Sequence, residues 1–261
     1  MAAPLPFTVE PLTLRTRDDV RLDAVMLTGD RDPDGPGVVV AHGFTGGWRE
    51  PPVRRVAALL SRYGRVLSFD FRGHGRSGGV STVGDQEIWD VEAAVAHLRQ
   101  RGCDRVATVG FSMGASVVVR HAGLVGGVVS AVSVSGPSRW YYRGTKPMRR
   151  VHWAIERPVG RAVARYALRT RIAPRGWDPV PVPPFEAAAL IAPTPFLVVH
   201  GDADPYFPIE HAHRLYAAAR EPRELWLEPG FGHAEGAATP ALLHRIGAWV
   251  AAHAEATPTV A

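Results

Sequence analysis

Apolar residues in this chain fall into short runs that alternate with stretches of helical spacing. Mostly apolar runs of strand length are typical of strands buried on both faces of a sheet. They occur at 38–41, 65–69, 106–110 and 127–134. Between them, segments 53–63 and 83–101 carry apolar side chains every three or four positions, which predicts amphipathic helices. Strands that alternate with helices indicate a largely parallel sheet covered on both faces.

Two segments depart from this alternation. Near the start, segments 12–17 and 20–27 alternate apolar and polar residues around a central pair of aspartates, which predicts an antiparallel hairpin. From about 136 to 189 the strand–helix order is lost. Within that stretch, segment 151–171 has the apolar spacing of one helix, so we predict a single helix there.

The strand–helix order then resumes. The predicted elements are a strand at 196–199, a helix at 209–219, a strand at 224–227 and a helix at 241–252. We therefore predict one α/β domain over 1–261, with a core at 1–136 and 190–261 and a cap inserted at 137–189 after the sixth strand.

Composition favours a globular protein of the cytoplasm. The 261 residues are 46% hydrophobic, enough for a sizeable core, yet every apolar run is too short to cross a bilayer. Residues 1–6 lack the basic and apolar regions of a signal peptide. The single cysteine, Cys103, cannot form an internal disulfide. We expect a cytoplasmic protein with no stable membrane insertion.

Positive charge is concentrated in the stretch where the strand–helix order is lost. Between Arg139 and Asp178 the chain has eleven basic and two acidic residues, so this segment carries +9 and the remainder −4, which sum to +5. Arginines recur there every four residues and would line one face of the predicted helix. They are Arg157, Arg161, Arg165 and Arg169. Such a local excess of positive charge favours an anionic substrate group or surface as the partner of this segment. The competing explanation is that the arginines only reflect the overall composition of the chain.

A serine between two glycines supplies the first candidate chemistry. Residues 110–114 read GFSMG, directly after a predicted strand and before a predicted helix. This is the context of a nucleophile elbow, in which Ser112 sits on a sharp turn with its hydroxyl exposed. The flanking glycines fit because a Cβ at either position would collide with neighbouring backbone at so sharp a bend.

A serine hydroxyl needs a base beside it and an acid to orient the base, and two loops offer them. Residues 200–208 (HGDADPYFP) and 229–235 (PGFGHAE) each follow a predicted strand. Because parallel strands end at one edge of a sheet, these loops and Ser112 should meet there. His233 is the candidate base. The candidate acids are Asp204 and Asp202, with Glu228 and Glu235 as weaker alternatives.

Together with residues 42–44 (HGF) and 70–77 (DFRGHGRS), these motifs resemble the α/β-hydrolase superfamily, in its branch of monoacylglycerol-lipase-like and serine-aminopeptidase-like hydrolases. The resemblance implies an eight-stranded, mostly parallel sheet with an antiparallel N-terminal hairpin and helices on both faces. It implies Ser112 as nucleophile, His233 as base and Asp204, in preference to Asp202, as acid. The oxyanion hole would be the backbone N–H groups of Phe44 and Met113.

The resemblance implies hydrolysis of a carboxylic ester or thioester of a small or lipid-like substrate through an acyl-enzyme. A peptidase or amidase of the same fold, or a binding protein that has lost catalysis, are the alternatives. Trp140, Tyr141 and Trp153 are candidate substrate-binding residues, unless they only pack the cap onto the core.

We expect no cofactor, no metal and no nucleic-acid partner. No dinucleotide or P-loop motif is present, and Glu210, His211 and His213 lack a complete ligand set. His42, His74 and His200 are expected to brace loops. The oligomeric state is left open.

Overall fold

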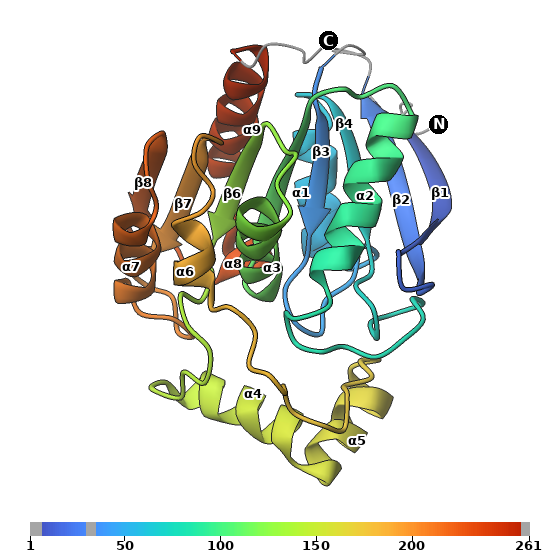
Figure 1. Cartoon of the computed structure of the whole chain (residues 1–261), viewed down its shortest axis with the longest axis vertical. Coiled ribbons are helices and arrows are strands. Elements are labelled where there is room, and N and C mark those ends of the chain that lie inside the picture. Colours follow the sequence, from blue (N-terminus) through green and yellow to red (C-terminus); the bar gives the residue numbers. More distant parts are fainter. Residues whose placement is uncertain (1–6, 30–34, 257–261) are drawn as a thin grey trace.

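A single eight-stranded sheet organises the computed structural model, which describes residues 7–29 and 35–256 (Figure 1). The strand order is β1-β2-β4-β3-β5-β6-β7-β8. β1 and β2 form the antiparallel hairpin, β2 also runs antiparallel to β4, and the remaining pairs are parallel. The strands are β1 Phe7–Arg15, β2 Arg21–Gly29, β3 Gly37–Ala41, β4 Arg65–Phe69, β5 Val106–Phe111, β6 Ser130–Val134, β7 Phe196–Gly201 and β8 Arg223–Glu228.

Helices cover both faces of the sheet, as the apolar strand runs predict. One hydrophobic cluster joins the sheet to α2, α3, α6 and α7, and a second joins its other face to α1, α8 and α9. β3, β5, β6 and β7 are buried along their whole length. The helices are α1 Pro51–Leu60, α2 Ile88–Gln100, α3 Met113–Leu124, α4 Lys146–Glu156, α5 Pro158–Ala167, α6 Pro184–Ala188, α7 Glu210–Ala218, α8 Ala234–Ala237 and α9 Pro240–Glu255.

Outside the insertion, the predicted strands and helices are all present in the predicted order, and one helix starts later than expected. The helix predicted over 83–101 begins only at Ile88. Val83 and Gly84 have φ angles of 56° and 102°, which a right-handed helix does not allow. Residues 1–6, where no signal peptide is expected, and 30–34 lie outside the described part of the chain.

The prediction of one helix over 151–171 is wrong, because two helices meet at Arg157. That residue is extended (φ −95°, ψ 136°), since a residue before proline avoids the α region and Pro158 has no N–H to donate. α5 then folds back onto α4. Gly160 makes the close approach possible, because a Cβ there would overlap the carbonyl oxygen of Trp153.

The insertion between β6 and β7 has two parts. α6 packs against α3 and α7 on the sheet. Among the helices and strands, α4 and α5 contact chiefly each other, and they lie beyond the end of the sheet where the parallel strands terminate (Figure 1). They therefore face the loops that follow the strands.

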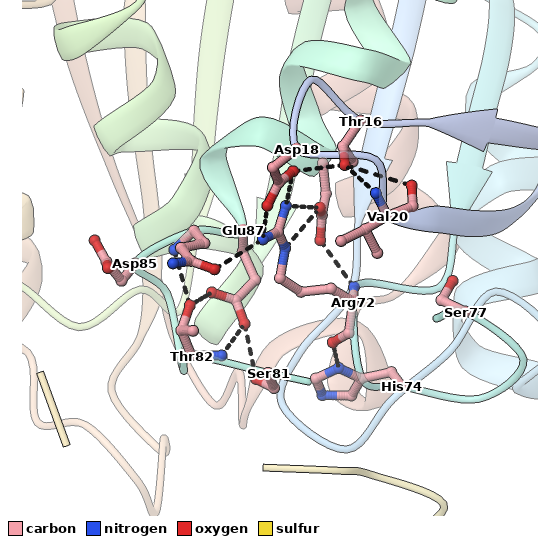
Figure 2. A network of polar contacts seen from close by, with 12 residues as sticks. Thr16, Asp18, Val20, Arg72, His74, Ser77, Ser81, Thr82, Asp85 and Glu87 are labelled. Carbon is pink, nitrogen blue, oxygen red and sulfur yellow. Dashed lines mark hydrogen bonds and ion pairs between the residues drawn. The ribbon is translucent and has the colours of Figure 1, made fainter. Parts of the chain in front are cut away.

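A buried polar network fixes the loops after β4 (Figure 2). The Arg72 side chain is 2% exposed, and its guanidinium donates to Asp90 at 2.9 Å and to Asp18 at 2.7 Å. Glu87 accepts hydrogen bonds from Ser81 Oγ and from backbone and side-chain donors within 82–84. Buried charges persist when they are paired in this way. The network holds segment 81–86 in place beside the site described next.

Candidate active site

Ser112 occupies the sharp turn between β5 and α3 that its flanking glycines predict. Its φ of 52° and ψ of −114° are strained for a residue with a side chain. A Cβ on Gly110 would overlap the Gly114 carbonyl oxygen, and a Cβ on Gly114 would overlap that of Ala41. The two glycines therefore allow the turn, which places the serine at the carboxyl end of the central strand.

His233 connects Ser112 to Asp204. Its Nε2 lies 2.9 Å from Ser112 Oγ, and its Nδ1 lies 2.8 Å from Asp204 Oδ2. A carboxylate at Nδ1 favours the tautomer that donates from Nδ1, which leaves Nε2 to accept from the serine hydroxyl. The ring of Tyr206 stacks on the imidazole with centroids 4.2 Å apart. The stacking restricts the imidazole to this orientation.

Asp204 is held as an anion inside the protein. Its side chain is 0% exposed. Burial alone would raise the pKa of this carboxyl, but hydrogen bonds from His233 and from the backbone N–H groups of Tyr206 and Phe207 outweigh it and lower the pKa. The anion can therefore stabilise a positive charge on His233.

The alternative acids have other partners. Asp202 accepts a hydrogen bond from the backbone N–H of Gly230 at 2.6 Å, which joins the two loops. Glu228 pairs with Arg245 at the surface. Glu235 accepts from the backbone N–H of Gly43. Of the four acids that the sequence offers, the structure brings Asp204 to His233.

The loop with Phe44 passes directly beside Ser112. A Cβ on Gly43 would lie 3.3 Å from Ser112 Cβ. Phe44 and Met113 both line the cavity in front of the serine. Met113 is the first residue of α3, so its N–H has no acceptor within the helix. Backbone N–H groups so placed can bind a developing negative charge.

His42 braces that loop as a neutral ring, as expected. Its Nδ1 donates to the Gly43 carbonyl at 2.7 Å, and its Nε2 accepts from the Phe71 N–H at 3.0 Å. Burial lowers the pKa of His42 to about 3. His200 likewise donates from Nε2 to the Phe207 carbonyl at 2.9 Å, which supports the loop of Asp204. His74 donates from Nδ1 to the carbonyl of Arg72.

A cavity of about 1190 Å³ lies in front of Ser112, and residues of α4 form part of its lining. Trp140 and Tyr141 line it, as the sequence suggests, whereas Trp153 is 46% exposed and does not. Trp177, which sequence reasoning missed, completes an aromatic wall, with its ring centroid 5.0 Å from Trp140 and 5.5 Å from Tyr141. The one sign of this role in the sequence is that Trp177 is an isolated tryptophan in a proline-rich stretch.

The cavity carries little net charge. Five acidic and four arginine side chains line it: Glu50, Asp85, Glu156, Asp178, Glu235, Arg120, Arg139, Arg150 and Arg175. The arginines at 157, 161, 165 and 169 do not contribute. Arg161 instead donates to the carbonyls of Ile155 and Glu156 at the end of α4. The positive charge of the insertion therefore lies mainly outside the cavity.

Within 7–29 and 35–256, no three His, Cys, Asp or Glu side chains are grouped so that they could hold a metal ion. Nδ1 of His211 instead accepts from the backbone N–H of Ser138 at 3.0 Å. Over the same residues, no helix is both long and apolar enough to cross a membrane.

Comparisons with known proteins agree with this architecture. Residues 38–252 match the alpha/beta hydrolase family. Monoacylglycerol lipase of Mycolicibacterium smegmatis is 28% identical over 258 residues, covering 82% of this chain and 86% of that protein. Proline iminopeptidase of Xanthomonas citri is 35% identical over 92 residues, 35% of this chain and 29% of that protein. An esterase structure from Pyrococcus furiosus has a TM-score of 0.73 and 24% identity, covering 98% of this chain and 94% of that one. The family match spans most of the sheet and both loops that meet Ser112, and the chain belongs to the alpha/beta hydrolase family.

Proposed function

We propose that this protein is a serine hydrolase that cleaves a carboxylic ester or thioester of a small or lipid-like substrate through an acyl-enzyme. One observation carries the proposal: the hydrogen-bonded chain from Ser112 through His233 to Asp204 opens into a large cavity. A strained serine joined to a base and a buried anion is the arrangement that activates a hydroxyl for attack.

In the first half of the proposed reaction, Ser112 Oγ attacks the substrate carbonyl carbon while His233 Nε2 takes the hydroxyl proton. Asp204 stabilises the imidazolium that forms. The N–H groups of Phe44 and Met113 bind the oxyanion. When the tetrahedral intermediate collapses, His233 returns the proton to the departing alkoxide or thiolate.

In the second half, water attacks the acyl carbon and gives its proton to His233. The ester bond to Ser112 breaks, the proton returns to Oγ, and the carboxylic acid leaves. Alkoxide and thiolate leaving groups need less protonation than an amine, which favours esters and thioesters over amides.

The cavity suggests an acyl group that is apolar. Its aromatic wall of Trp140, Tyr141 and Trp177 offers stacking and apolar contact. Because the lining carries five acids and four arginines, we propose an uncharged acyl group rather than an anionic one. We propose residues 137–189 as the cap that bounds this cavity, and the cytoplasm as the site of action.

The test is labelling by a fluorophosphonate, which reacts covalently with an activated serine. We expect labelling of the wild type and none of Ser112→Ala. A folded wild type that resists the probe would favour a binding protein over a hydrolase. A panel of aryl esters, acyl thioesters and a prolyl anilide then separates esterase, thioesterase and peptidase activity, the last because of the partial match to proline iminopeptidase.

A further inference from the structure

One side of α5 presents apolar side chains to solvent. Val159, Val163 and Tyr166 are 67%, 45% and 79% exposed. Their spacing of four and three residues places them on one face of the helix. The residues of α5 that are buried, Gly160 and Ala164, lie on a different face, against the rest of the insertion. We call the three exposed residues the α5 stripe.

The α5 stripe is separate from the cavity. No residue of α5 lines the cavity, which takes Met148, Val151 and Ile155 from α4. Exposed apolar side chains are also concentrated in this part of the molecule. Of the fourteen large hydrophobic residues that are exposed in the described chain, eight lie between Tyr141 and Val182, and four of these do not line the cavity: Trp153, Val159, Val163 and Tyr166. Apolar exposure gathered in one region marks an interaction surface.

Three exposed arginines lie close to the stripe along the sequence. Arg157 precedes α5, Arg169 follows it, and the Arg165 guanidinium lies 5.6 Å from the ring of Tyr166; all three arginines are exposed. Among the described residues of segment 139–178, one arginine, Arg143, forms an ion pair with a carboxylate, that of Glu156. Apart from Arg143, five basic residues of the segment are exposed and do not line the cavity: Lys146, Arg149, Arg157, Arg165 and Arg169. Their charge is available to an outside partner.

We propose that the α5 stripe and its arginines dock this protein onto an anionic lipid bilayer surface. Val159, Val163 and Tyr166 would enter the interfacial region, and Arg157, Arg165 and Arg169 would contact lipid phosphates. A helix with an apolar face and flanking basic residues binds such surfaces through burial of its apolar side chains and through attraction between its positive charges and the anionic lipids. A second copy of the chain fits less well, because it would bring two +9 segments together. Docking needs no catalysis and is independent of the proposed activity.

The test is sedimentation of the full chain with phosphatidylcholine vesicles, with and without phosphatidylglycerol, across a salt series. We expect binding to the phosphatidylglycerol vesicles that weakens with salt. The variant Arg157→Gln/Arg165→Gln/Arg169→Gln should lose on the order of 100-fold in affinity, from about fivefold per arginine. Its matched control, Arg54→Gln/Arg62→Gln/Arg220→Gln, removes the same charge from exposed sites outside the insertion and should bind like the wild type.

A second variant tests the contribution of the apolar side chains to vesicle binding separately from that of the arginines. Val159→Ser/Val163→Ser/Tyr166→Ser should also bind at least tenfold more weakly, whereas Val9→Ser on β1, an exposed valine elsewhere, should not. Unchanged thermal unfolding shows that the variants are folded, and Ser112→Ala should bind like the wild type. Failure of the wild type to sediment at low salt would overturn the proposal. So would equal losses in the control variants, or a dimer in solution that the stripe variant converts to monomer.

Discussion

The backbone N–H of Gly43 donates to Glu235 Oε1 at 3.1 Å, which ties the loop of Phe44 to the short helix after His233. That helix is itself anchored, because Arg55 donates to the carbonyls of Glu235 and Ala238. The proposed base and the proposed oxyanion hole are therefore connected by one side chain.

Glu235→Ala should lower kcat by about 10- to 100-fold with a small change in KM, because the Phe44 N–H would lose its support. Glu235→Gln keeps an oxygen acceptor for Gly43 and should remain close to the wild type. Steady-state kinetics on a soluble aryl ester measures both. Equal activity of the alanine and glutamine variants would show that this hydrogen bond does not position the loop.

Asp204→Asn should reduce kcat by about 10⁴-fold, because an amide cannot hold His233 in the required tautomer or stabilise its positive charge. Asp202→Asn removes a carboxylate two residues away that binds the Gly230 N–H, and an amide oxygen can still accept there. The control should stay within a few fold of the wild type. A comparable loss in both variants, measured as kcat, would contradict the assignment of the acid.

Gly114→Ala should destabilise the fold by about 1–3 kcal/mol or more, because its Cβ would meet the backbone of Ala41 and His42. Gly236→Ala is the matched control, since no atom lies within 4 Å of the Cβ it would add. Urea unfolding compares the two. A Gly114→Ala protein as stable as the control would mean that the elbow has more room than its contacts imply.

Acid should weaken the fold through histidines that are buried as neutral rings. Burial lowers the pKa of His42 to about 3 and those of His121 and His211 to about 4, from a usual 6.5. Below pH 6.5 the unfolded chain binds these protons and the folded chain does not, so stability falls as the pH drops from 6.5 towards 4. Each group contributes about 1.4 kcal/mol per pH unit at most.

His121→Gln isolates one of these groups, because His121 is buried in α3 away from Ser112. In urea unfolding across this pH range, the variant should show a shallower loss of stability than the wild type. The exposed His213, replaced in the same way, should leave the slope unchanged. An unaltered slope in His121→Gln would mean that this ring takes up its proton as readily in the folded protein as in the unfolded chain.

The sheet and the meeting of the three loops followed from local patterns. Fully buried strands leave continuous apolar runs, and parallel strands that end at one edge bring Ser112, Asp204 and His233 together. The break at Arg157 could also have been predicted, since Pro158 lies inside the predicted helix. It was missed because the helical spacing of apolar residues continues on both sides of the break.

Other features depended on contacts between distant segments. Trp177 meets Trp140 only because the chain returns past Thr82, whose carbonyl accepts from the Trp177 indole at 2.6 Å. The hydrogen bond between Gly43 and Glu235 joins residues 192 positions apart. Periodicity reports which face of an element is buried, and it does not report which partner covers that face.

The back-to-back packing of α4 and α5 has a consequence for access to the cavity. Because these helices rest chiefly on each other, substitutions within them leave the packing of the sheet largely undisturbed. Substitutions can therefore alter the boundary of the cavity and the outer surface of α5 without moving Ser112, Asp204 or His233. The range of molecules that reach the proposed nucleophile can thus change through the insertion alone.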